Sequence, residues 1–180
     1  MKMMEPRTHR RITRSRKKTV PLSKLRTSEV VKTVVDHPRR IEELVDMLED
    51  KDRVIRSRAA ATLARLSESH PGRLLRILER IKETLSDDSA YVRWHLSYTL
   101  GRVGLKFPAR SQPYLNELSA RLEDDNKVVR VIAARALGMV ASRRPHLIQS
   151  LFQSNKREIP THVARILRSK SRKPEKPDSR

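Results

Sequence analysis

The segment Leu48-Glu-Asp-Lys-Asp-Arg-Val-Ile-Arg56 recurs along the chain as Leu85-Ser-Asp-Asp-Ser-Ala-Tyr-Val-Arg93 and again as Leu122-Glu-Asp-Asp-Asn-Lys-Val-Val-Arg130. The closing arginines stand at 56, 93 and 130, a constant spacing of 37 residues. Two further sets of residues keep this spacing: Leu63, Leu100 and Leu137, and Pro71, Pro108 and Pro145. A fixed period in this range is typical of a solenoid, whose repeats stack because no single repeat buries its apolar side alone.

Within each period, the apolar residues are spaced as in two helices. Ile41, Leu44, Val45 and Leu48 follow the i, i+3, i+4, i+7 pattern of a helix with one buried side. A turn at 50–52 follows, and the next helix carries apolar residues at 55, 59, 63 and 66. The sequence therefore predicts an all-α fold, an α-solenoid of antiparallel helix pairs, with a first (A) and a second (B) helix in each repeat.

The charge distribution divides the chain into a repeat domain and two basic ends. Residues 1–26 hold ten Lys/Arg and one acidic residue, and residues 168–180 hold six Lys/Arg and two acidic residues. Both ends lack apolar periodicity and are predicted to be basic disordered arms. Between them we expect a HEAT-like domain at 27–167, with a cap helix at 28–37, regular repeats at about 38–71, 72–108 and 109–145, and a degenerate unit at 146–167.

The composition limits the chemistry. There is no cysteine, which excludes disulfides, zinc–cysteine sites and thiol nucleophiles. The histidines lack metal-binding spacing, and four glycines supply no phosphate loop, so no metal or cofactor is expected. No stretch is apolar enough to span a membrane, and the basic segment 1–21 lacks the apolar core of a secretory signal. The expected location is the cytoplasm, including the nucleoid.

An aspartate in the A–B turn, an arginine six residues later and a small residue three beyond that resemble the HEAT repeat family. The matching sets are Asp50, Arg56 and Ala59; Asp87, Arg93 and Leu96; and Asp124, Arg130 and Ala133, where Leu96 departs from the small-residue preference. The resemblance covers about 38–167. It implies that these aspartates and arginines form a structural ladder of hydrogen bonds between successive turns. We therefore expect Arg56, Arg93 and Arg130 to pair with Asp50, Asp87 and Asp124 rather than with a ligand.

Acidic residues are unevenly distributed over the repeats. The B segments 53–67, 91–107, 127–144 and 159–169 contain no Asp or Glu. The resemblance implies that B helices line the concave side of the solenoid. The residues expected to point away from the core there form one stripe: Arg58, Arg65, His95, Tyr98, Arg102, Arg135, His162 and Arg165. Focused positive potential is typical of a polyanion site, although the same arginines would also suit a solvated helix face.

Trp94 is the single tryptophan and neighbours His95 in the sequence. It either stacks on a nucleobase or fills the space between adjacent B helices, opposite Ser57 and Val131. Packing is the favoured interpretation.

A total of 41 Lys+Arg against 21 Asp+Glu gives a net charge of +20, which predicts attraction to polyanions. We expect a non-enzymatic binding or scaffold module that holds nucleic acid, DNA or RNA, through phosphate contacts. The alternative is a protein–protein adaptor that binds an acidic segment of its partner. HEAT-like enzymes that excise alkylated bases use a carboxylate on the concave side, and the B segments carry none. Neither a membrane nor a small-molecule substrate is expected as a partner.

Overall fold

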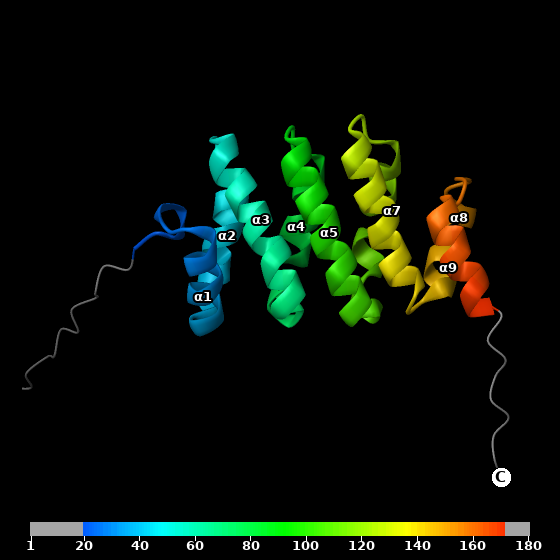
Figure 1. Cartoon of the computed structure of the whole chain (residues 1–180), viewed down its shortest axis with the longest axis horizontal. Coiled ribbons are helices and arrows are strands. Elements are labelled where there is room, and N and C mark those ends of the chain that lie inside the picture. Colours follow the sequence, from blue (N-terminus) through cyan, green and yellow to red (C-terminus); the bar gives the residue numbers. More distant parts are fainter. Residues whose placement is uncertain (1–19, 172–180) are drawn as a thin grey trace, which may run out of the picture.

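The computed structural model describes residues 20–171, and every regular element in that range is a helix (Figure 1). The B helices lie side by side in the front layer of Figure 1: α1 (Thr27–Asp36), α3 (Arg53–Ser69), α5 (Ala90–Lys106), α7 (Lys127–Ala141) and α9 (Thr161–Ser171). The A helices stand behind them: α2 (Ile41–Leu48), α4 (Leu78–Glu83), α6 (Leu115–Ala120) and α8 (Pro145–Ser154). The predicted all-α solenoid of helix pairs is confirmed.

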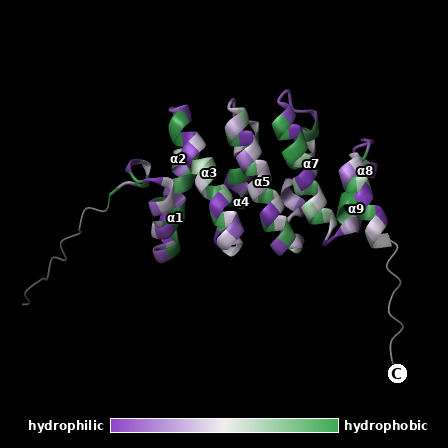
Figure 2. Cartoon of the chain, viewed as in Figure 1, coloured by the Kyte–Doolittle hydropathy of each residue, from purple (hydrophilic) through white to green (hydrophobic). Residues whose placement is uncertain are grey.

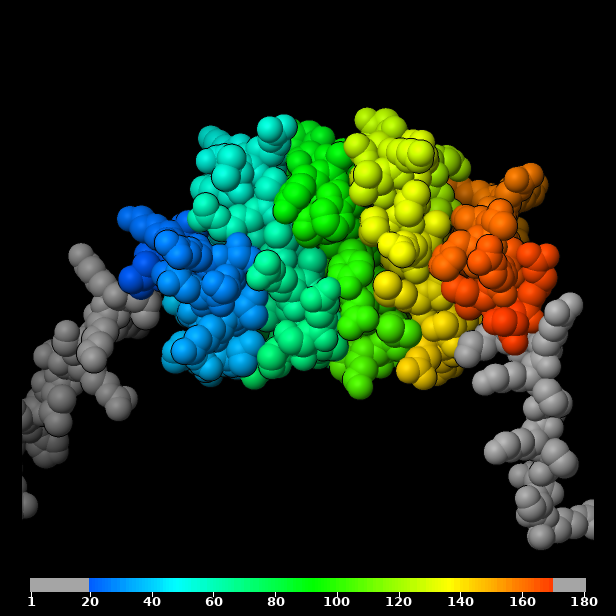
Figure 3. All heavy atoms as spheres, in the orientation of Figure 1, coloured from blue at the N-terminus to red at the C-terminus, as the bar shows by residue number. Residues whose placement is uncertain are grey.

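The two layers differ in regularity. The A segments of the second and third regular repeats are short α-helices extended by 3₁₀ turns, which are η3 (Pro71–Ile77), η4 (Thr84–Ser86), η5 (Pro108–Arg110), η6 (Gln112–Tyr114) and η7 (Arg121–Glu123). Prolines begin several of these turns, since proline lacks the N–H that a continuing helix needs. The B helices α3, α5 and α7 are long and unbroken, and their side chains make up much of the face seen in Figure 3.

The core is aliphatic and lies between the layers. Leu44 of α2 and Leu63 of α3 are fully buried, as are their counterparts Ile81, Leu100, Leu118 and Leu137. Leu96, which departs from the small-residue preference, is also fully buried. Figure 2 shows hydrophobic and hydrophilic residues on each labelled helix, as expected of helices that bury one side. No described helix is long and apolar enough to cross a membrane.

Gly101 sets the distance between α5 and α7. A Cβ atom at this position would lie 2.7 Å from both the Cα and the Cβ of Ala136 on α7. Backbone occupies that space, so a side chain at 101 would force the two helices apart. A Cβ at Gly72, by contrast, would lie 3.5 Å from the nearest atom, Cζ of Phe107, which is an ordinary contact.

We expect Gly101→Ala to lower the free energy of unfolding by about 1–3 kcal/mol, because overpacking outweighs the better helix propensity of alanine. Urea unfolding followed by circular dichroism measures this. Gly72→Ala is the control, with an expected change of less than about 0.5 kcal/mol. An unchanged midpoint for Gly101→Ala would mean that the two helices can separate at no cost.

The ladder residues connect neighbouring repeats. Arg93 donates from Nε and Nη2 to the carboxylate of Asp124 at 2.8 and 2.7 Å, and from Nη1 to the carbonyl oxygen of Asp87 at 2.9 Å. Arg56 bonds in the same way, from Nε to Asp87 Oδ2 at 2.7 Å and from Nη1 to Asp50 O at 2.9 Å. Each guanidinium therefore joins the carbonyls of its own A–B turn to the carboxylate of the next repeat.

The predicted ladder between successive turns is therefore present, but the predicted carboxylate partners, Asp50 for Arg56 and Asp87 for Arg93, are wrong. The own-repeat turn offers backbone carbonyls, and the carboxylate comes from the repeat that follows. The carboxylate of Asp50 accepts from the backbone N–H of Asp52 at 2.8 Å and has no arginine partner among residues 20–171. At the other end, Arg130 bonds the carbonyls of Asp124 and Asp125, and the degenerate unit supplies no carboxylate for it within the described range.

The domain is longer at both ends than predicted. Leu22, in η1 (Leu22–Lys24), is 1% exposed and belongs to the core, so residues 20–26 are not an arm. Arg40 Nη2 and Arg58 Nη1 donate to the carbonyls of Val20 and Ser23, both at 2.7 Å, and hold this segment against the domain. α9 runs to Ser171, past the predicted end at 167. The rest of the predicted arms, 1–19 and 172–180, lies outside the described residues.

Candidate functional site

The two layers differ in how their charges are paired. In the A layer, four arginines are paired with glutamates: Arg40 with Glu43, Arg76 with Glu42, Arg80 with Glu49, and Arg157 with Glu123. On α3, α5, α7 and α9, Glu68 is the one acidic residue within the described range. The arginines without an ion pair there include Arg53, Arg65, Arg102, Arg135 and Arg165. We call the outward side of α3, α5, α7 and α9 the B-helix face, and it carries uncompensated positive charge.

The predicted stripe lies partly on this face. Arg65, Arg135, His162 and Arg165 are exposed. Arg102 is half-buried, and its Nε is buried without a hydrogen-bond partner among the described residues. Arg58 is also half-buried, and its guanidinium is engaged with Ser23. The structure thus leaves Arg65, Arg102, Arg135 and Arg165 as arginines available to a ligand.

His95 is not a surface contact, contrary to the prediction. It is 6% exposed, and its Nδ1 lies 2.8 Å from the carbonyl oxygen of Tyr91. Burial lowers the pKa of His95 despite the raising effect of that carbonyl, so the ring is neutral near neutral pH. The equivalent residues in the neighbouring repeats, Arg58 and Ile132, are also partly buried. This position of the B helix is therefore turned partly toward the adjacent B helices and not fully toward solvent.

The expectation of a B-helix face free of acidic groups is also wrong. α3 continues to Ser69, so Glu68 belongs to the helix, and its Oε1 accepts a hydrogen bond from the Tyr98 hydroxyl at 2.8 Å. Burial and this carboxylate raise the pKa of Tyr98, and the charges of the nearby Arg102 and Arg135 oppose the shift. One carboxylate therefore lies among the arginines near the middle of the face.

An aromatic hollow of ≈ 410 Å³ lies next to this carboxylate, between α3 and α5. Arg65 and Glu68 line it from α3, and Tyr91, Trp94 and Tyr98 line it from α5. Trp94 is half-buried and packs on His95, with ring centroids 3.5 Å apart, and on the edge of Tyr91 at 5.5 Å. It therefore packs within its own helix and also borders open space, which neither of the two interpretations of Trp94 described.

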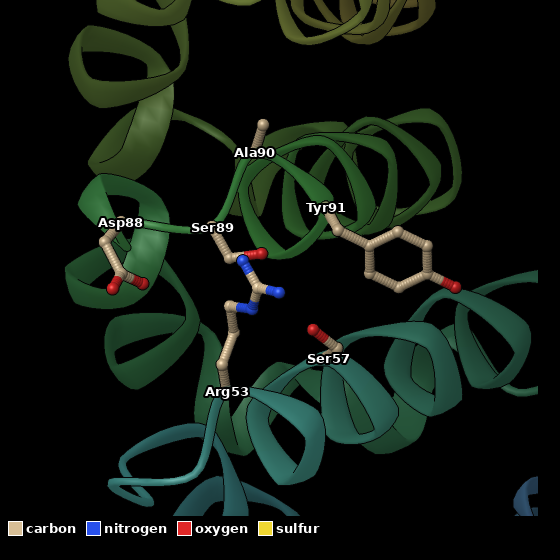
Figure 4. A pocket seen from close by; sticks show the side chains of 6 residues that line it. All are labelled: Arg53, Ser57, Asp88, Ser89, Ala90 and Tyr91. Atoms are coloured by element: carbon tan, nitrogen blue, oxygen red, sulfur yellow. The ribbon is translucent and has the colours of Figure 1, made fainter.

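A second hollow of ≈ 460 Å³ adjoins the first at the start of α5 (Figure 4). Its lining includes Arg53 and Ser57 from α3, and Ser89 and Tyr91 from the α5 terminus. Figure 4 shows the Ser89 hydroxyl and the Arg53 guanidinium pointing toward one another across the opening. Among residues 20–171, no three His, Asp or Glu side chains are grouped to hold a metal ion.

Sequence reasoning missed Tyr91, Glu68, Arg53 and Ser89 as members of the site. One signal was available for the aromatic residues, since 91, 94 and 98 follow the i, i+3, i+7 spacing of one helix side. The polar members carried no such signal, because their placement depends on where α3 ends and how α5 begins.

Residues 74–171, more than half of the chain, match the family described as non-SMC mitotic condensation complex subunit 1 (Cnd1). The chain belongs to this family. Membership in the Cnd1 family agrees with the predicted HEAT-like solenoid, which is confirmed. No curated protein matches the chain.

Solved structures similar to this Cnd1-family chain are repeat proteins. A designed armadillo repeat protein in complex with the peptide (KR)4 has a TM-score of 0.61 at 16% identity, over 81% of this chain and 67% of that chain. A computationally designed armadillo repeat protein for modular peptide recognition has a TM-score of 0.61 at 16% identity, over 81% and 69%. An engineered protein has a TM-score of 0.58 at 19% identity, over 82% and 67%. At these identities the likeness shows the fold alone.

Proposed function

We propose that this chain is a binding scaffold whose B-helix face holds nucleic acid through its phosphates. The observation that carries the proposal is the set of arginines on that face with no ion pair in the described range, whereas Arg40, Arg76, Arg80 and Arg157 of the A layer are paired with glutamates. Free guanidinium groups bind phosphate with two parallel N–H donors, which paired ones cannot do. Phosphate neutralisation then supplies most of the affinity and little sequence preference.

A second candidate is an adaptor that binds an acidic segment of another protein. The family description names a subunit of a complex, which favours a protein partner somewhere on this chain. The designed armadillo neighbour holds the basic peptide (KR)4. The B-helix face of this chain is itself basic, so a protein segment that matches it would be acidic. Both candidates use the same arginines, and a binding measurement distinguishes them.

Charge reversal on the B-helix face tests the proposal. We expect Arg65→Glu/Arg135→Glu in the full chain to weaken binding to short duplex or single-stranded nucleic acid by tenfold or more. Both side chains are exposed and unpaired, so the fold keeps its contacts. Fluorescence anisotropy across salt concentrations measures this, and the slope of log K against log salt should fall by about one for each lost phosphate contact.

Arg39→Glu/Arg110→Glu is the matched control, because both residues are exposed, lie outside the B helices and give the same change in net charge. Its affinity should fall by no more than about threefold through the general field. Equal losses in the two double variants would contradict a site on the B-helix face. Tight binding of an acidic peptide that nucleic acid fails to displace would support the adaptor instead.

A further inference from the structure

The two hollows on the B-helix face meet at Tyr91, which lines both of them. One is polar and lies at the N-terminus of α5, and the other is aromatic and lies alongside its second and third turns. Tyr91 is 48% exposed, so its ring is accessible from the surface between them. Two adjoining hollows of different chemistry suit a ligand that has one anionic and one flat end.

The polar hollow has the groups that bind a phosphate. The first N–H groups of a helix point outward without partners, and α5 has no side-chain cap, whereas Asp52 caps α3 and Asn126 caps α7. Ser89 is 8% exposed, and its hydroxyl has no hydrogen-bond partner among residues 20–171, although Figure 4 shows it aimed into the hollow. The hydroxyl is therefore free to donate a hydrogen bond to a ligand in the hollow, in a residue whose remaining surface is buried.

Charge in the polar hollow favours an anion. Arg53 is exposed and has no ion pair in the described range, and the Ser57 hydroxyl lies on the same side of the opening. Asp88 also lines this hollow, but its carboxylate is already paired with Arg56 Nη2 at 2.5 Å, and Figure 4 shows it directed away from Ser89 and Arg53. The positive end of the α5 dipole adds to the attraction.

The aromatic hollow suits a nucleobase. Tyr91, Trp94 and Tyr98 line one side of it, and bases stack on such side chains without requiring a particular sequence. Glu68 at its edge repels phosphate and can accept a hydrogen bond from an exocyclic amino group of a base. The charges of Arg53 and Glu68 thus give a bound nucleotide one orientation, with its phosphate at Ser89 and its base toward Tyr98.

We infer that the polar and the aromatic hollow between α3 and α5 together form a subsite for one nucleotide of single-stranded nucleic acid. Its phosphate sits on Ser89, Arg53 and the uncapped N–H groups of α5, and its base stacks among Tyr91, Trp94 and Tyr98. This rests on the proposed binding of nucleic acid and deepens it, because stacking requires an unpaired base, which a duplex does not offer.

Ser89→Asp tests the phosphate half of the subsite. An aspartate there can cap α5 as Asp52 caps α3, so the variant should fold at least as well as the wild type while a carboxylate occupies the phosphate position. We expect about tenfold weaker binding of a short single-stranded DNA to the full chain. Asn126→Asp is the matched control, since it adds the same charge at the equivalent cap of α7, and its affinity should fall no more than about twofold.

Arg53→Glu provides a second variant for the phosphate half, with Lys127→Glu as its control at the equivalent position of α7. Both residues are exposed and unpaired within the described range. Arg53→Glu should weaken single-strand binding several-fold more than Lys127→Glu. Equal effects within either variant and control pair would overturn the phosphate assignment.

Trp94 reports on the base half, because it is the single tryptophan of the chain. Single-stranded DNA should quench its fluorescence, and an abasic strand of the same length should bind without quenching. Tyr91→Ala should weaken binding of the single strand about tenfold and leave the abasic strand unchanged. Val128→Ala, at the equivalent exposed position of α7, should change neither.

The outcomes separate the subsite from the proposed function. If duplex and single strand both bind but Trp94 is not quenched, the nucleotide subsite is wrong while the proposed function stands. If no nucleic acid binds, both fail. A phosphoserine peptide that binds and is lost with Ser89→Asp, while DNA leaves Trp94 unquenched, would overturn the inference in favour of a protein ligand.

Discussion

Asp124→Ala is expected to lower the free energy of unfolding by about 3–5 kcal/mol, the usual cost of breaking a buried ion pair from one side. Asp124 is 8% exposed and receives two hydrogen bonds from Arg93, which is 7% exposed. Its removal leaves a buried guanidinium whose remaining carboxylate partner is the exposed Asp125. Urea unfolding followed by circular dichroism gives the value.

Asp50→Ala is the control for this prediction because it removes an aspartate at the equivalent turn position. The Asp50 carboxylate accepts from the backbone N–H of Asp52 and has no arginine partner in the described range, so its loss should cost only about 1 kcal/mol. Comparable losses at positions 50 and 124 would show that stabilisation comes from the turns and not from the link between repeats.

The same ion pair predicts a dependence on pH. Burial alone would raise the pKa of Asp124, but the hydrogen bonds from Arg93 and from the Asn126 N–H offset it and hold the pKa at about 2. A carboxylate with a lowered pKa stabilises the fold above its unfolded-state pKa of 3.8. The stability difference between the wild type and Asp124→Ala should therefore be constant above about pH 5 and shrink as the pH falls toward 2.

The sequence predicted the architecture well because residues at equivalent positions of each repeat take the same place in the fold. A period of 37 residues shows which residues repeat, and apolar spacing shows which side of each helix is buried. Neither shows how far a side chain reaches, so the arginines were recognised as structural while their partners were placed one repeat too early. Residues 20–26 were missed for another reason: Val20, Leu22 and Leu25 are few apolar residues in a basic segment and give no helical periodicity.

The candidate site was predictable to the extent that it depends on composition. The scarcity of acidic residues on the B helices pointed to the arginines that the structure leaves unpaired. Its detailed geometry depends on where helices begin and end, which the sequence pattern does not give. α3 extends two residues beyond the predicted end and so includes Glu68. Ser89 makes no cap hydrogen bond, which leaves the first N–H groups of α5 without a side-chain partner. The residues that line the two hollows therefore depend on the helix ends, which are the least predictable part of a helix.

Leu22→Ala should destabilise the domain by about 2–4 kcal/mol, although the residue lies in a segment that the sequence assigns to an arm. Leu22 is 1% exposed and belongs to the same core cluster as Val30, Leu44 and Leu63. Removing its side chain leaves a cavity in the core cluster between η1 and the helices that it contacts. Urea unfolding measures the loss, and Val20→Ala, 53% exposed, is the control with an expected change below about 0.5 kcal/mol.

This prediction also tests what the N-terminal segment does at the B-helix face. Ser23 O accepts from Arg58, which keeps that guanidinium from serving a ligand. If residues 20–26 form a true cap, Leu22→Ala lowers stability while the nucleic-acid affinity of the folded protein stays equal or rises, because Arg58 gains freedom. If stability is unchanged, the segment only rests on the domain, and the solenoid begins at α1 as the sequence alone suggests.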